Sequence, residues 1–286
     1  MTTLIDRKAA DARPDSPAYA LGYSSDEFRR LELQGAFFRD LTEDVLKRAG
    51  LRAGMHVLDV GCGVGDVALL AGEFVGPTGR VLGIDRSHDA IAIARRRAAA
   101  AGQNWTLFEA SEIETYTTSL RFDAIVGRLV LGYLPDAVAA LRRLLGLLRP
   151  NGVVAFQEIA LPLIRSVPPG ALFDQCSQWV TDAFGPAGFE VDMGGKLYAT
   201  FVAAGLADPQ MIAAGRVAGG PESPLYDYMT GVVRSLLPMI ERFNVATAAE
   251  VGIDTLAERL RREALASNAC IMLPPLVGAW SRKTPS

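Results

Sequence analysis

The segment that most constrains the fold of this chain is residues 57–70, which read VLDVGCGVGDVALL. An apolar run is followed by the alternating glycines Gly61, Gly63 and Gly65 and then by residues with helical spacing. Glycine permits a sharp turn and lets a ligand approach the backbone closely, and the following helix begins with free N–H groups. The segment therefore predicts a strand, a ligand-binding turn and a helix in succession.

A second apolar run, RVLGID at 80–85, ends in the carboxylate of Asp85, 20 residues after Gly65. An acid at the end of this strand can accept hydrogen bonds from both ribose hydroxyls of an adenosine. Without such donors a buried acid would be penalised. The ligand is therefore expected to contain adenosine.

The glycine spacing separates two kinds of adenosine ligand. The dinucleotide fingerprint G-x-G-x-x-G would place its third glycine at position 66, where this chain has Asp66, and a carboxylate there would repel a pyrophosphate. Asp59, two residues before Gly61, likewise suits a ligand with a cationic amino group better than one with phosphates. The amino acid end of S-adenosylmethionine carries such a group.

Short apolar runs alternate with helical stretches between Gly54 and Gly152, which predicts an α/β fold with a parallel sheet wound with helices. The predicted strands are 55–60, 80–85, 105–109, 122–127 and 152–158, and the predicted helices are 66–74, 88–101 and 136–148. The run Arg95–Arg97 is interpreted as the solvated face of its helix. Before this core, residues 25–49 have the spacing of one or two helices.

The alternation breaks after Glu158. A proline-containing piece leads into a predicted helix at 171–184, a helix at 196–204 and a strand at 210–217 restore the α/β order, and a helix-rich insertion precedes a last strand at 271–280. The expected division is an N-terminal arm with helices (1–50), a cofactor-binding core (51–160), an insertion (161–190), more core (191–217), a helical lid insertion (218–268) and the last core strand (269–286). The two insertions and the N-terminal helices are expected to cover the ligand edge of the sheet as a lid.

Composition narrows the function classes. Lys and Arg total 29 against 32 Asp and Glu, so the chain has no basic excess of the kind that attracts nucleic acid or anionic lipid. Its three cysteines are scattered, with no CxxC pair and only two histidines, so no metal site is expected. The charged N-terminus lacks an export signal, and residues 264–281, although uncharged, contain two prolines. We therefore expect a cytoplasmic protein that does not enter membranes.

Taken together, these features resemble the class I S-adenosylmethionine-dependent methyltransferase family, whose first motif matches residues 59–65. The resemblance extends over Asp85, over FDAIVGRLVLGYLPD after the fourth strand and over LLRPNGVVAFQE before the fifth. Within the family the chain is similar to the group of ubiquinone, menaquinone and small-molecule methyltransferases. The resemblance implies a Rossmann-like seven-stranded sheet with helices on both faces and an antiparallel last strand.

The resemblance also implies a cofactor site. Gly61, Cys62 and Gly63 would line the methionyl part, Asp85 and Arg86 the ribose and adenine, and Ser111 with Glu112 the adenine edge. The family commonly has Asp where this chain has Ser111, so the adenine contact would come from a hydroxyl or from backbone groups. Arg128 after the fourth strand and Gln34 from the N-terminal helix would complete the site, together with Asp59.

Catalytic residues are less evident, because transfer from a sulfonium mainly requires alignment and exclusion of water. If the acceptor needs a base, the candidates are His88, Glu158 and Asp174. Several aromatic residues outside the core pattern suggest an apolar acceptor pocket: Tyr19, Tyr23, Phe37, Phe38, Trp179, Phe184, Tyr226 and Tyr228. The expected acceptor is a small apolar or aromatic metabolite.

Three functions remain open from the sequence. The first is small-molecule methyl transfer, with S-adenosylhomocysteine as product. The second is a protein that binds S-adenosylmethionine without transferring its methyl, as a regulator or as an aid to a rearrangement. The third, disfavoured by Asp59 and Asp66, is an NAD-dependent dehydrogenase. The acceptor atom and any association between copies of the chain stay undetermined.

Overall fold

The computed structural model describes residues 34–284, and its main feature is a seven-stranded mixed sheet. The strand order is β3 (Thr106–Ala110), β2 (Arg80–Asp85), β1 (His56–Val60), β4 (Phe122–Arg128), β5 (Leu148–Ile159), β10 (Leu276–Arg282) and β7 (Gln210–Ala214). The first five strands are parallel, and β10 is antiparallel to both of its neighbours. The predicted Rossmann-like sheet with an antiparallel last strand is confirmed.

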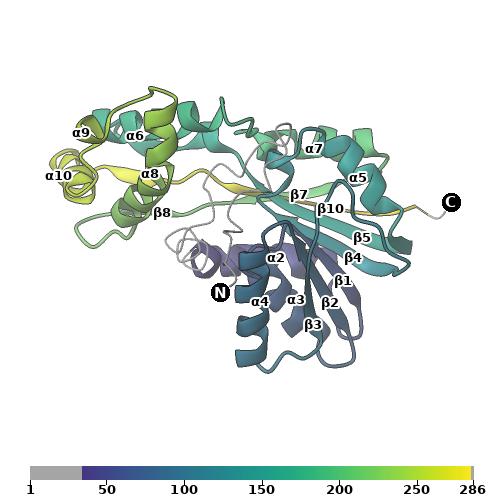
Figure 1. The fold of residues 1–286 in the computed structure, drawn as a ribbon. Helices are drawn as coiled ribbons and strands as arrows, with labels where there is room; N and C mark the ends of the chain where they lie inside the picture. The colour runs from purple at the N-terminus through teal and green to yellow at the C-terminus, as the bar shows by residue number, and fades with distance from the viewer. Residues whose placement is uncertain (1–33, 285–286) are drawn as a thin grey trace, which may run out of the picture.

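Helices cover both faces of this sheet (Figure 1). On one face lie α2 (Arg39–Ala49), α3 (Asp66–Val75) and α4 (His88–Ala100), and on the other lie α5 (Ala137–Leu145) and α7 (Met193–Ala204). Because successive side chains of a strand point to opposite faces, Val57 belongs to the first apolar core and Leu58 to the second. Both side chains are fully buried, which explains why the central parallel strands carry apolar residues on both faces.

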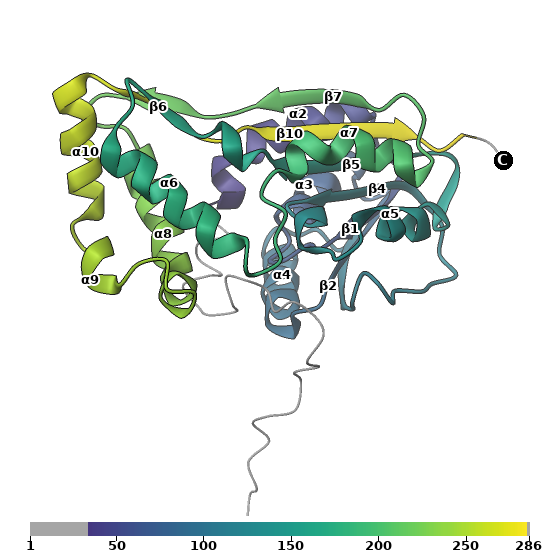
Figure 2. The ribbon, with the colours of Figure 1, turned by 90° about the horizontal axis from the view of Figure 1, so that it is seen from above.

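A second, helical unit stands beside the carboxyl edge of the sheet and has its own apolar core (Figure 2). We call it the lid. It contains α6 (Ala171–Phe184), α8 (Leu225–Arg242), α9 (Ala248–Val251) and α10 (Leu256–Ser267), with a small sheet of β6 (Arg165–Val167), β9 (Cys270–Met272) and β8 (Val217–Gly219). Two short 3₁₀ turns, Leu131–Tyr133 and Leu161–Leu163, complete the described elements.

Two strands predicted as single core strands prove to be divided between the two sheets. The predicted strand 210–217 consists of β7 in the main sheet and the start of β8 in the lid, and the predicted strand 271–280 consists of β9 in the lid and β10 in the main sheet. Pro274 and Pro275 lie between β9 and β10, where their missing N–H groups cannot take part in a ladder. The predicted last core domain, 269–286, thus also supplies a lid strand.

The predicted helix 136–148 was too long. Asp136 caps α5 by accepting a hydrogen bond from the N–H of Ala139 at 2.8 Å, but the helix ends at Leu145. The fifth strand then begins at Leu148, which pairs with Phe122, rather than at Gly152. Pairing with β4 thus overrides the helical spacing of these residues. No described helix is long and apolar enough to cross a membrane.

Candidate functional site

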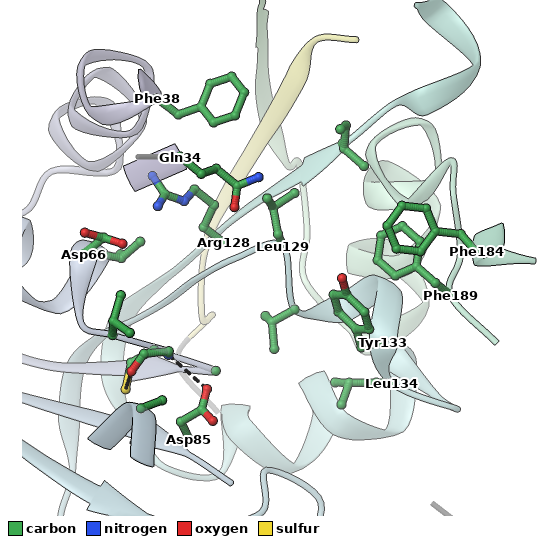
Figure 3. Close-up of a pocket in the computed structure, with 18 of the residues that line it drawn as sticks. Gln34, Phe38, Asp66, Asp85, Arg128, Leu129, Tyr133, Leu134, Phe184 and Phe189 are labelled. Carbon is green, nitrogen blue, oxygen red and sulfur yellow. Dashed lines mark hydrogen bonds between the residues drawn. The ribbon is translucent and has the colours of Figure 1, made fainter. Parts of the chain in front are cut away.

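A cavity of about 230 Å³ lies at the carboxyl ends of β1, β2 and β4, between the sheet and the lid. Open α/β sheets bind ligands at this edge. Figure 3 shows Asp66 and Asp85 on one side of the cavity, Tyr133, Phe184 and Phe189 on the opposite side, and Arg128 and Leu129 between them. The cavity therefore has a polar end and an apolar, aromatic end.

The glycine turn after β1 forms part of the polar end. Gly61 and Gly63 have φ values of 65° and 52°, in the left-handed region that side chains rarely adopt. A Cβ atom at Gly61 would lie 2.4 Å from Cγ2 of Val130. The alternating glycines thus permit both the sharp turn and the close approach of the neighbouring chain.

Asp85 is anchored to this turn. Its Oδ2 accepts a hydrogen bond from the N–H of Gly63, and its Oδ1 accepts one from the N–H of Ser87, both at 2.9 Å. Burial raises the pKa of Asp85 above its usual value, while the two N–H groups and the charge of Arg86 act in the opposite direction. Each carboxylate oxygen keeps a further lone pair for a ligand hydroxyl.

Asp59 does not itself line the cavity. It is 1% exposed, and neither carboxylate oxygen has a hydrogen-bond partner in the described part of the chain. Burial raises the pKa of Asp59 well above its usual value, and the nearby charge of Arg128 opposes that shift. The positive charge of Arg128 favours the charged form of Asp59, and a cationic group of a ligand at the adjoining turn would favour it further.

Arg128 reaches the cavity from the end of β4 and connects it to the N-terminal helix. Its Nη1 donates to Thr42 Oγ1 at 2.9 Å, and the Thr42 hydroxyl lies 2.8 Å from Gln157 Oε1. Gln34 and Phe38 line the same region. Gln34 and Arg128 therefore both line the cavity, and their contact with a cofactor stays a prediction.

Asp66 is held by the arginine run of α4. Arg97 donates to Asp66 Oδ1 at 2.7 Å and to the backbone oxygen of Val64 at 2.7 Å, and Arg95 donates to the oxygen of Phe108. Arg95 and Arg96 are exposed, in agreement with the interpretation of this run as a solvated face, but Arg97 is half-buried and departs from it. Arg97 thus holds the glycine turn and the start of α3, whereas Arg95 contacts the backbone of β3.

The predicted adenine side also comes together. Arg86, Ser111 and Glu112 all line the cavity beside Asp85, and the N–H of Ser111 donates to the backbone oxygen of Asp85 at 2.9 Å. Ile113 and Ala90 add apolar surface there. A flat, uncharged ring would contact these apolar groups, while polar groups surround its edge.

The aromatic end is only partly as expected. Phe38, Phe184 and Tyr228 line the cavity; Phe37, Trp179 and Tyr226 do not, and Tyr19 and Tyr23 lie outside the described residues. Tyr133 and Phe189 were missed, although their ring centroids lie 4.4 Å apart and Phe189 is 4.8 Å from Phe184. Tyr133 follows β4 within the segment GYLPD, and that position was the signal that could have revealed it.

The three predicted base candidates do not line the cavity. His88 and Asp174 are exposed, on α4 and α6 respectively, and neither belongs to the lining. Glu158 is fully buried at the end of β5, beside the lining residue Ile159. Cys62 does line the cavity, but burial raises the pKa of its thiol well above the usual value, which disfavours a thiolate.

The donor and acceptor groups fit an adenosine ligand with a cationic amino acid end. Asp85 can accept ribose hydroxyls, the glycine turn lets such a ligand approach, and the unpartnered Asp59 would gain from a nearby positive charge. Among residues 34–284 no group of three or more His, Cys, Asp or Glu side chains is arranged to hold a metal ion.

Comparison with known proteins agrees with this geometry. Residues 51–205 match the model of a methyltransferase-domain family. The chain is 32% identical over 120 residues to a demethylmenaquinone methyltransferase of Staphylococcus aureus, an alignment that covers 42% of this chain and 49% of that protein. The chain thus matches about half the length of this curated relative.

Solved structures share the fold. The YcgJ protein of Bacillus subtilis has a TM-score of 0.55 at 20% identity, covering 85% of this chain and 99% of its own. A phosphoethanolamine N-methyltransferase of Haemonchus contortus, solved with S-adenosyl-L-methionine, has a TM-score of 0.53 at 16% identity, covering 86% and 53%. At these identities the likeness concerns the fold alone.

Proposed function

This chain belongs to the methyltransferase-domain family, and from that premise we propose that it binds S-adenosylmethionine and transfers the methyl group directly to a small apolar or aromatic metabolite. The observation that carries the proposal is the two-ended cavity, which joins an adenosine-compatible polar end to an aromatic end. The family match favours this function over the dehydrogenase alternative.

The polar end would hold the cofactor. Asp85 would accept hydrogen bonds from the ribose hydroxyls, Ser111 and Glu112 would lie along the adenine edge beside Arg86, and Gly61, Cys62 and Gly63 would contact the methionyl part. Asp59 would favour the cationic amino group of the cofactor electrostatically. Arg128 and Gln34 would cover the side of the cofactor that the glycine turn leaves open. When bound, S-adenosylmethionine supplies an electrophilic methyl group on a sulfonium.

The aromatic end would orient the acceptor and exclude water. Tyr133, Phe184 and Phe189 form a contiguous ring cluster, and Met229 and Val232 from α8 cover it from the lid. In-line transfer requires the acceptor atom at roughly 3–3.5 Å from the methyl carbon in a site without competing water. An apolar wall of this kind fits a ring or chain better than a charged polymer.

The proposed acceptor is a small molecule in the cytoplasm rather than a nucleic acid. The net charge of −3 gives no support for a nucleic acid acceptor. Cys62, Cys176 and Cys270 are all free thiols, as suits a reducing cytoplasm. The proposal makes no use of a second copy of the chain.

Calorimetric titration with S-adenosylmethionine, S-adenosylhomocysteine and NAD tests the cofactor. Binding of both sulfur nucleosides and not of NAD is expected; binding of NAD alone would overturn the proposal. Methyl-labelled S-adenosylmethionine would then be incubated with the protein and a panel of hydroquinones, phenols and aromatic amines, with RNA and a peptide mixture in parallel. Label in a small molecule is expected. Label only in RNA or peptide would refute the acceptor class, and cofactor binding without transfer would favour the non-transferring alternative.

A further inference from the structure

Glu158 is a buried acid that the proposed reaction does not use directly. It lies at the end of β5, is fully buried and does not line the cavity. Its Oε1 accepts hydrogen bonds from two consecutive backbone N–H groups, those of Val130 at 2.9 Å and Leu131 at 2.7 Å. Both belong to residues 129–134, which we call the β4 turn.

The β4 turn contains a residue in an unfavourable backbone conformation, which contacts with neighbouring segments must stabilise. Leu129 has a φ of 56°, in the left-handed region that costs a non-glycine residue roughly 1 kcal/mol or more. Its N–H donates to the backbone oxygen of Gln157 at 2.8 Å, and the oxygen of Gly132 accepts from the N–H of Glu190 at 2.8 Å. Between these two backbone contacts, the carboxylate of Glu158 accepts the hydrogen bonds of the Val130 and Leu131 N–H groups.

The turn contacts both ends of the cavity. Val130 packs so closely on Gly61 that no Cβ fits between them, and the ring of Tyr133 lies against Phe189. Leu129, the first residue of the turn, points into the middle of the cavity (Figure 3). The position of the turn therefore sets the spacing between the glycine turn and the aromatic end.

We propose that Glu158 is a positioning residue, whose Oε1 holds the β4 turn so that Val130 stays against Gly61 and the two ends of the cavity keep a fixed spacing. The role rests on the proposed function, since direct transfer depends on how cofactor and acceptor are aligned. To hold the turn, the side chain at position 158 needs an acceptor oxygen rather than a negative charge. Glutamine, which keeps such an oxygen in a side chain of the same shape, should therefore replace glutamate.

Hydrogen exchange of the full chain, read by mass spectrometry on peptides that cover the β4 turn, tests the proposal without any ligand. Three variants are compared with wild type: Glu158→Gln, Glu158→Met and Glu263→Met. Glu263 is a matched control, because its carboxylate also accepts two consecutive backbone N–H groups, those of Leu172 and Phe173 at the start of α6. The affinity of each variant for S-adenosylhomocysteine is measured in parallel.

In Glu158→Met the amides of Val130 and Leu131 should exchange about tenfold faster or more, because both buried N–H groups lose their hydrogen-bond acceptor. Its affinity for S-adenosylhomocysteine should fall as Val130 leaves Gly61. Glu158→Gln should restore both properties, and Glu263→Met should change neither. Failure of wild type to bind S-adenosylhomocysteine would count against the proposed function, whereas the exchange rates would still report on the turn.

Three outcomes would overturn the positioning role. One is unprotected exchange at Val130 and Leu131 in wild type, which needs no variant to fold. Another is equally fast exchange in Glu158→Gln and Glu158→Met, which would assign the effect to charge. The last is faster exchange in Glu158→Met with unchanged affinity for S-adenosylhomocysteine, which would leave Glu158 a purely structural residue.

Discussion

The carboxylate of Asp85 accepts a hydrogen bond from the backbone N–H of Gly63 at 2.9 Å. The acid that ends β2 is thereby tied to the glycine turn that follows β1, although 22 positions separate the two residues in the chain. One side chain thus shapes the turn and presents acceptor oxygens to the cavity.

Replacing Asp85 by alanine should weaken binding of S-adenosylhomocysteine by about tenfold or more. The variant loses the proposed hydrogen bonds to the ribose hydroxyls as well as those from the N–H groups of Gly63 and Ser87. Titration calorimetry measures the effect. Asp89→Ala is the matched control, since Asp89 is exposed in the first turn of α4 and does not line the cavity. Equal affinities for the two variants would show that Asp85 takes no part in recognition.

Gly61→Ala should destabilise the protein and impair ligand binding. A Cβ there would meet Val130 Cγ2 at 2.4 Å, in addition to the cost of a left-handed residue of about 1–2 kcal/mol. Gly102→Ala measures the cost of the left-handed conformation without a clash, because Gly102 has a φ of 67° but open space around it. Denaturant unfolding should show a clearly larger loss for Gly61→Ala.

The double variant Gly61→Ala/Val130→Ala completes this comparison. Removing the Val130 methyl groups relieves the closest contact, so the double variant should regain part of the stability lost in Gly61→Ala. Strict additivity of the two single substitutions would mean that the residues do not clash.

Arg216→Met should loosen the connection between the N-terminal helix and the lid. Arg216, between β7 and β8, donates to the backbone oxygen of Phe37 and pairs with Asp40, and the hydrogen bond from Arg216 holds the pKa of Asp40 below its usual value. The Phe37 ring in turn stacks on Tyr228 of α8, with centroids 4.6 Å apart. The expected loss in unfolding free energy is about 1.5–3 kcal/mol.

Arg234→Met provides the comparison for this variant. Arg234 faces the largely exposed Asp254 at 3.5 Å, and an exposed pair contributes only about 0–1 kcal/mol. Thermal unfolding of both variants measures the difference. Similar losses would contradict a specific role of Arg216 in holding the lid.

Glu158→Gln should change how stability depends on pH. Burial raises the pKa of Glu158 to about 7 from an ordinary 4.5. Between these values the folded protein keeps a proton that the unfolded chain releases, so the stabilising contribution is complete below the lower value and is lost as the pH rises through the upper. Glutamine has no proton to lose.

Relative to wild type, Glu158→Gln should therefore gain up to roughly 3 kcal/mol in unfolding free energy as the pH rises across this window. Denaturant unfolding of the ligand-free proteins at a series of pH values measures the change. A difference between the two proteins that stays constant with pH would show that Glu158 titrates normally in the folded state.

The sequence alone determined the polar end of the cavity. The strand, the three glycines and the helix are contiguous, so their turn geometry is local, and Asp85 ends the next strand, where parallel pairing brings strand ends together. Arg86, Ser111, Glu112 and Arg128 likewise follow strands of the same sheet. The family resemblance singled out these residues, and their positions at the ends of parallel strands place them at one edge of the sheet.

Only the tertiary structure decided the aromatic end, the backbone partners of Glu158 and the division of two strands between sheets. Tyr133 meets Phe189 across 56 positions of sequence, a contact that no local spacing encodes. The chain between β9 and β10 leaves one sheet for another because the lid and the core each bury their own apolar cluster. Local patterns specify which elements form. Burial against distant partners decides which side chains meet, and whether a buried acid faces the cavity or accepts hydrogen bonds from the backbone.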